Sequence, residues 1–201
     1  MNSWNRGNRS AELHYAIGRA LGQRYEEALR IEQSNAHRRL SDDRWQTIEK
    51  ELLRETLLHL EQSRSVELEA ASYLDALIAL YERQFDKALK YANLASIQCP
   101  WLYEATKLKA DILYERWLVA SRNGEEGKEE ASLLAALKLY DQATTVGRSD
   151  VILYEARAAA WHTLLTMRYK QGRPLEELIP SAISACQDTI TASPKRPTGY
   201  Q

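Results

Sequence analysis

Three segments of this 201-residue chain carry small side chains at one repeated spacing, which strongly limits the folds that the chain can adopt. In each segment the second position follows the first by four residues, and the third follows the second by three. Such positions share one face of an α-helix, where small side chains allow a neighbouring helix to approach closely. A large residue at the middle position fills the space between adjacent repeats; Tyr140 stands there in the second segment, and Cys186 occupies the same position in the third. The positions, with the proline that follows two of the segments, are Ala88, Ala92, Ala95 and Pro100; Ala136, Tyr140 and Ala143; and Ala182, Cys186, Thr189 and Pro194.

Apolar residues recur with a period near 3.6 along almost the whole chain, as amphipathic helices require. Leu74, Leu77, Ile78 and Tyr81, for example, follow the i, i+3, i+4, i+7 pattern. Only 8 glycines, 5 prolines and 4 valines stand against many strong helix formers. Because the connections are short, successive helices should be antiparallel neighbours. The sequence therefore predicts an all-α protein of about eight helices, stacked as antiparallel pairs in an α-α solenoid.

Capping and breaking residues mark the expected helix boundaries. Ser41–Asp43 and Ser149–Asp150 have the side chains and acidic character of N-caps. Residues 123–127 predict a loop, and Pro180 predicts a kink or a delayed start of the last helix. Gly22 leaves open whether the first helix continues past it.

The repeated spacing resembles the second helix of tetratricopeptide repeats, which reads A-x3-F/Y-x2-A followed by proline. The first-helix pattern of that family, W-x2-L-G, is matched only loosely, as at Ile17–Gly18. The period is 48 residues from Ala88 to Ala136 and 46 from Ala136 to Ala182, longer than the roughly 34 of the family. The resemblance implies a divergent, right-handed superhelix of helix pairs. Its expected parts are a polar segment at 1–10, one or more N-terminal pairs at 11–64, repeats at 65–100, 101–148 and 149–194, and a tail or truncated next repeat at 195–201.

Several short segments also occur in an order similar to the helical-repeat region that follows the catalytic domain of some large bacterial, eukaryotic-like serine/threonine protein kinases. The resemblance implies a cytoplasmic, non-catalytic segment of a larger signalling protein. The chain itself has no glycine-rich loop, H-R-D or D-F-G motif, so no enzymatic activity is expected of it. The segments that carry the resemblance are His14–Arg19, Tyr25–Leu29, Pro100–Ala105, Lys107–Leu108, Arg148–Asp150 and Ala185–Cys186.

Composition argues against several classes of partner. The 27 basic and 28 acidic side chains give a net charge of -1, whereas nucleic-acid binding normally needs a basic face. Cys99 and Cys186 form no disulfide framework, which favours a reducing cytoplasm. No apolar run approaches the ~20 residues of a membrane span, and Met1–Ser10 lacks the apolar core of a signal peptide. We expect neither a nucleic-acid partner nor membrane insertion.

The residues able to carry chemistry have simpler structural interpretations. Glu51, Glu55 and His59 share one helical face and could ligate a metal, but a solvated stripe with an exposed histidine is the preferred interpretation. His14 and His162 are expected to be packed or half-exposed, and Cys186 to pack as a small apolar residue. Trp101, Trp117 and Trp161 are expected in the core or between repeats rather than as a surface for base stacking. No metal or cofactor is therefore predicted.

A protein–protein interaction scaffold is the function that the sequence predicts. A partner helix or extended peptide would lie in a concave groove lined by the first helices of the repeats. Self-association through an uncapped last helix is the alternative, and a helical metalloenzyme or an RNA-binding repeat is a weaker one. The asparagines of the family's carboxylate clamp are missing, so binding of a partner's C-terminus is not expected. The candidate groove residues are Lys107, Asp111, Arg157 and His162.

Overall fold

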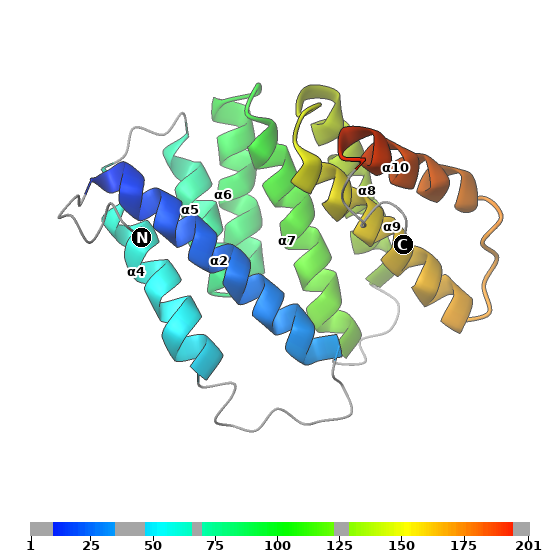
Figure 1. Cartoon of the computed structure of the whole chain (residues 1–201), viewed down its shortest axis with the longest axis horizontal. Coiled ribbons are helices and arrows are strands. Elements are labelled where there is room, and N and C mark those ends of the chain that lie inside the picture. Colours follow the sequence, from blue (N-terminus) through cyan, green and yellow to red (C-terminus); the bar gives the residue numbers. More distant parts are fainter. Residues whose placement is uncertain (1–9, 35–46, 66–69, 123–128, 195–201) are drawn as a thin grey trace. The chain divides into compact units, whose positions relative to one another are not determined.

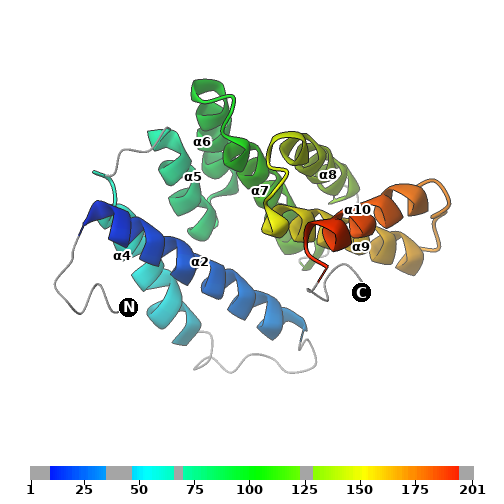
Figure 2. The ribbon, with the colours of Figure 1, turned by 45° about the horizontal axis from the view of Figure 1, so that its top comes forward.

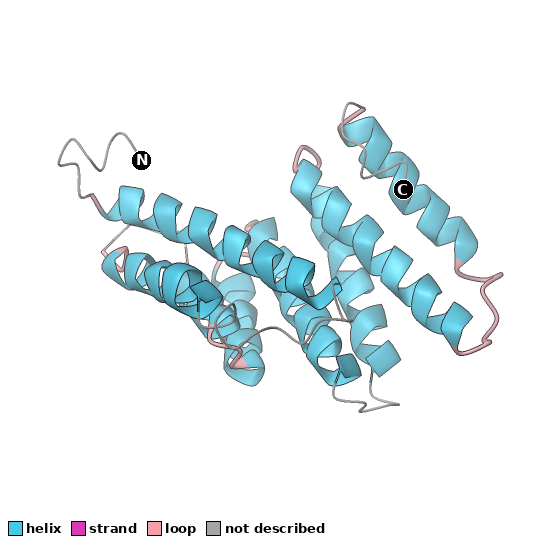
Figure 3. Ribbon diagram, turned by 60° about the horizontal axis from the view of Figure 1, so that its bottom comes forward, coloured by secondary structure: helices cyan, strands magenta, loops and turns pink. Residues whose placement is uncertain are grey.

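The computed structural model of the chain describes residues 10–34, 47–65, 70–122 and 129–194 (Figure 1). All regular elements in these ranges are helices, which confirms the all-α prediction (Figure 3). The chain divides into two compact units, Met1–Gln84 and Phe85–Gln201. The boundary between the units falls within the predicted repeat 65–100. None of the described helices combines the length and the apolar character that crossing a membrane requires.

The first unit contains α2 (Ala11–Ser34), the π-helical turn η1 (Glu49–Leu53), α4 (Arg54–Gln62) and α5 (Ala71–Tyr81). Helix α2 packs along α4 (Figures 1 and 2). Glycines allow α2 to pack closely against both of its neighbours. A Cβ at Gly18 would lie 2.8 Å from the Leu60 side chain of α4, and one at Gly22 would lie 2.3 Å from the Tyr81 ring of α5. Helix α2 thus continues through Gly22, which settles a point that the sequence left open.

Helix α5 supplies much of the core of the first unit, since only Ala71 and Asp75 of its eleven residues are not buried. The connection from α4 to α5 is held by Arg64, whose Nη1 lies 2.8 Å from Asp75 Oδ1 and whose guanidinium also pairs with Glu61. Helix α4 ends at Gln62.

The second unit contains α6 (Phe85–Gln98), α7 (Tyr103–Arg122), α8 (Glu129–Val146), α9 (Val151–Lys170) and α10 (Ile179–Ala192). Each of these helices packs against the next one in the chain, and α7 also contacts α9 (Figure 2). The α7–α9 contact includes a hydrogen bond of 2.9 Å between the hydroxyls of Tyr114 and Thr163. Neighbours in sequence are therefore neighbours in space throughout this unit.

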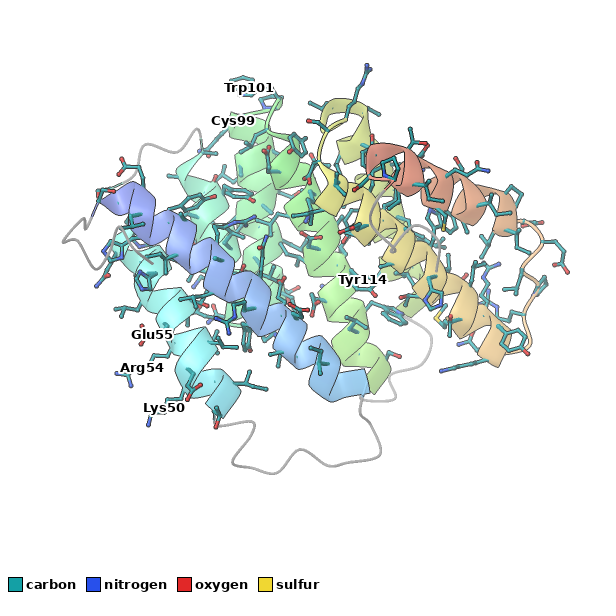
Figure 4. All side chains as sticks on the ribbon, in the orientation of Figure 1. Lys50, Arg54, Glu55, Cys99, Trp101 and Tyr114 are labelled. Atoms are coloured by element: carbon teal, nitrogen blue, oxygen red, sulfur yellow. The ribbon has the colours of Figure 1, made fainter. Side chains whose placement is uncertain are left out.

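The repeated small residues lie where the sequence places them, on helix faces that pack against other helices. All are buried except Cys186, which is half-buried, and the two prolines, which are exposed at Pro100 and Pro194. Trp117 and Trp161 are buried as predicted. Trp101, in contrast, is 64% exposed, so the prediction that it packs in the core or between repeats is wrong. It lies in the turn after α6, beyond the helix face that packs (Figure 4).

The predicted boundaries of α9 and α10 are confirmed. Asp150 caps α9, because its Oδ1 accepts hydrogen bonds from the backbone N–H groups of Ile152 at 3.0 Å and Leu153 at 3.2 Å. Pro180 stands in the first turn of α10, where its missing N–H would have had no helical partner. The predicted cap at Ser41–Asp43 and the predicted loop at 123–127 lie outside the described residues.

Candidate functional site: a polar groove on three helices

The four predicted groove residues fall into separate places on the second unit. Lys107 Nζ lies 2.8 Å from Asp111 Oδ2 on α7, and the Tyr140 hydroxyl of α8 donates a hydrogen bond of 2.7 Å to Asp111 Oδ1. Arg157 belongs to a different cluster. His162 is exposed on α9, so the prediction that it is packed or half-exposed is wrong. The structure thus brings together Lys107 and Asp111 but not all four residues.

Arg157 joins three helices through its guanidinium group. Its Nε donates to Asp141 Oδ1 on α8 and its Nη1 donates to Asp188 Oδ2 on α10, both at 2.7 Å. The Arg157 side chain is 13% exposed, whereas each aspartate side chain is 47% exposed. Charged hydrogen bonds of this length are stronger than neutral ones, and the planar guanidinium fixes the direction of both. Arg157 therefore holds α8, α9 and α10 in one defined arrangement.

An open groove of about 500 Å³ lies over this cluster. It is contained entirely within the second unit and takes side chains from three consecutive helices. Most of these side chains are polar, and the exposed serines stand on α10. The lining residues are Asp141 and Thr144 of α8, Arg157 and Trp161 of α9, and Pro180, Ser181, Ser184 and Asp188 of α10.

The groove follows from the helical spacing of its residues. Arg157 and Trp161 are four residues apart on α9, and Pro180, Ser184 and Asp188 recur every four residues on α10, so each set lies on one face. The small residues Ala182 and Ala185 are buried on another face of α10 and allow it to lie close to the rest of the unit. Helix α10 therefore has a face of small residues that packs within the unit and, beside it, a polar face that lines the groove.

Thr189 fixes α10 against α9. Its hydroxyl lies 2.8 Å from the carbonyl oxygen of Ala185 and 3.1 Å from that of Tyr154 on α9. The threonine is buried, so these contacts satisfy a hydroxyl that water does not reach. Thr189 is one of the residues with the repeated spacing. By fixing α10 against α9, it also fixes the relative positions of two helices that line the groove.

The predicted metal-ligating face has a different arrangement in the structure. Lys50 and Arg54 project outward from η1 and the start of α4 (Figure 4). His59 is half-buried and its Nδ1 lies 2.9 Å from Nδ1 of the buried His14, so it is not the exposed histidine of a solvated stripe. Burial lowers the pKa of His59, the charge of His14 lowers it further, and the carboxylate of Glu55 opposes both effects. Among the described residues, no group of three or more His, Cys, Asp or Glu side chains could hold a metal ion.

Sequence reasoning named Arg157 but missed its partners and the serines of the groove. One signal could have found the partners: Arg157 stands within a run of alanines, Ala156 and Ala158–Ala160, on a helix expected to pack closely. A charged group in such a place needs carboxylates from adjoining helices. The identity of those carboxylates depends on how the three helices are rotated, which the spacing alone does not give.

Comparison with protein-family models and with curated proteins gives no match to this chain. The tetratricopeptide-like repeat and the relation to kinase-associated repeats therefore stay predictions.

Proposed function

We propose that this protein is a protein–protein interaction module, a divergent tetratricopeptide-like array that holds a segment of a partner in the groove on α8, α9 and α10. The observation that carries the proposal is the open polar groove whose walls are held together by the Arg157 bridge to Asp141 and Asp188. The chain-order packing of α6 to α10 and the buried small residues support the array.

The groove suits an extended segment of polypeptide better than a small apolar ligand. Its exposed hydroxyls and carboxylates can hydrogen-bond to main-chain amides, while Pro180 and Trp161 offer apolar contact. Because the three helices are already fixed by charged hydrogen bonds, the groove loses little conformational entropy when it is filled. The groove therefore has its binding conformation before the peptide binds.

Peptide display against the complete chain tests this function. Peptides that it yields should lose binding to Ser184→Trp, because the indole fills the groove from an exposed position of α10. They should keep binding to the matched variant Gln142→Trp, which places the same bulk at an exposed position of α8 outside the groove. Equal binding to both variants would show that the groove is not the binding site.

Self-association is a second candidate, supported by a row of exposed apolar residues on α6 and the turn that follows it. Leu94 and Ile97 are three residues apart on α6 and are 43% and 74% exposed, and Trp101, in the turn after this helix, is 64% exposed. Exposed apolar rows of this kind often mark protein contacts. Light scattering at increasing protein concentration should then show a dimer that Ile97→Lys abolishes. A monomer at every concentration would exclude this candidate.

A further inference from the structure

We propose that the groove selects a basic segment, an extended peptide whose lysine or arginine side chain is bound between Asp141 and Asp188. This inference rests on the function proposed above and adds the chemistry of the partner.

The charges of the lining favour a cation. Two carboxylates and one guanidinium give the groove a formal charge of -1. Arg157 uses one oxygen of each aspartate, and the other two, Asp141 Oδ2 and Asp188 Oδ1, accept no hydrogen bond from any described residue. Both aspartate side chains are about half exposed. A second cation can therefore pair with them while the bonds to Arg157 stay in place.

The remaining polar groups suit the main chain of a peptide. The Ser181 and Ser184 hydroxyls are exposed on α10 and form no hydrogen bond within the described part of the chain. The Nη2 amino group of Arg157 is likewise without an acceptor among those residues. A peptide carbonyl can accept from Nη2 while the serines bond to neighbouring amides.

An acidic segment is rejected by the same groups. A carboxylate or a phosphate in the groove would meet two aspartates, and the one guanidinium nearby already gives two of its donors to them. Repulsion between the ligand's negative charge and the two aspartates reduces affinity for acidic segments. The specificity for a basic segment follows from this repulsion as much as from attraction. The groove therefore differs from sites that hold a partner's acidic terminus.

The test measures binding of the complete chain to dodecapeptide libraries that are identical except for one central residue, fixed as Lys, Arg, Gln or Glu. The Lys and Arg libraries should bind at least about tenfold better than the Glu library, with Gln between them. High salt should reduce this preference, because the ligand charge is partly exposed to solvent. Asp141→Asn/Asp188→Asn should remove the preference for Lys and Arg or reverse it toward Glu, since asparagine still accepts from Arg157 but leaves the guanidinium as the only formal charge of the lining.

Ser184 gives a second pair of variants that leaves the Arg157 bridge intact. Ser184→Lys should abolish binding of the Lys library by placing an ammonium in the site, and Ser184→Glu should strengthen it. Gln142→Lys and Gln142→Glu make the same charge changes outside the groove and should have little effect.

Peptides that bind in the groove without preference for a basic residue would overturn this inference and leave the proposed function standing. The same conclusion would follow if Ser184→Lys and Ser184→Glu changed binding of the Lys library in the same direction. Binding that Ser184→Trp does not block would overturn both proposals. If the double asparagine variant fails to fold, the Ser184 pair decides the question.

Discussion

Gly147 lies against the ring of Tyr103, and the absence of a side chain there determines how closely the end of α8 approaches the start of α7. A Cβ at this position would lie 2.5 Å from two ring carbons, Cδ2 and Cε2. The ring is partly buried against the hydrophobic cluster of this unit, which limits its freedom to move. Gly147→Ala should therefore lower the free energy of unfolding by about 1–3 kcal/mol, as measured by urea denaturation. Removing the ring with Tyr103→Ala should relieve most of the effect of Gly147→Ala, and an unchanged loss would contradict the steric cause.

The contact between His14 and His59 predicts a dependence of stability on pH. The pKa of His59 is lowered by burial and by the charge of His14, so the unfolded chain takes up its proton at a higher pH than the folded chain. This contribution to stability is fully present above the ordinary histidine pKa of about 6.5 and is lost as the pH falls below it. Urea denaturation at about pH 7.5 and about pH 5.5 should show the decrease.

His59→Gln is the control for this pH dependence, because glutamine can still hydrogen-bond to His14 but does not titrate. The variant should lose less stability between the two pH values than the original chain. A variant that loses the same amount would show that other groups cause the dependence.

The burial or capping role of a single residue was predictable where it depends on the pattern within one helix. It was not predictable where it depends on contacts with distant segments of the chain. The buried alanines and the Asp150 cap follow from spacing within one helix, and both are confirmed. The partners of Arg157 come from α8 and α10, and the partner of His59 comes from α2, 45 residues away. Such contacts depend on the rotation of whole helices, which a single sequence does not reveal.

Helix α8 offers a direct test of the packing assigned to the small residues. Ala136 is fully buried in a cluster that includes Trp117, Leu133 and Leu164, whereas Ala135 next to it is exposed. Ala136→Arg would overfill this cluster and bury a charge, so the free energy of unfolding should fall by about 3 kcal/mol or more. Ala135→Arg has the same helix propensity and the same charge and should change stability by less than about 0.5 kcal/mol. Similar losses in the two variants would mean that the register of α8 is wrong.

Helices as elements were largely predictable, but their irregularities were not. The apolar period gives the described helices, and Pro180 marks the start of α10 correctly. The π-helical turn η1 has no sequence signal: the Arg54 N–H bonds to Glu49 O, five residues back, within an ordinary helical pattern. The course of α2 through Gly22 is equally undetermined locally, because the Tyr81 ring of α5 fills the space that the glycine leaves. In both places tertiary packing decides what the local pattern leaves open.

At the scale of the whole chain, the repeated spacing shows that a helix has a close neighbour without showing which one. It therefore groups residues 65–100 as one repeat, although the division between compact units falls after Gln84. Within the second unit the order of packing follows the chain, as the short connections predict. The groove takes its residues from α8, α9 and α10, and these helices belong to two of the predicted repeats, 101–148 and 149–194.

The division into units predicts which fragment of the chain folds. A cluster of buried apolar residues in the second unit lies within residues 110–185, and α6 packs against α7. A fragment of residues 85–201 should therefore keep its helical circular dichroism, unfold cooperatively in urea and bind the same displayed peptides as the complete chain. A fragment of residues 101–201 follows the predicted repeat boundary instead and lacks α6. It should be less stable, because α7 would lose α6 as a packing partner. Two fragments of equal stability would favour the repeat boundary over the boundary between units.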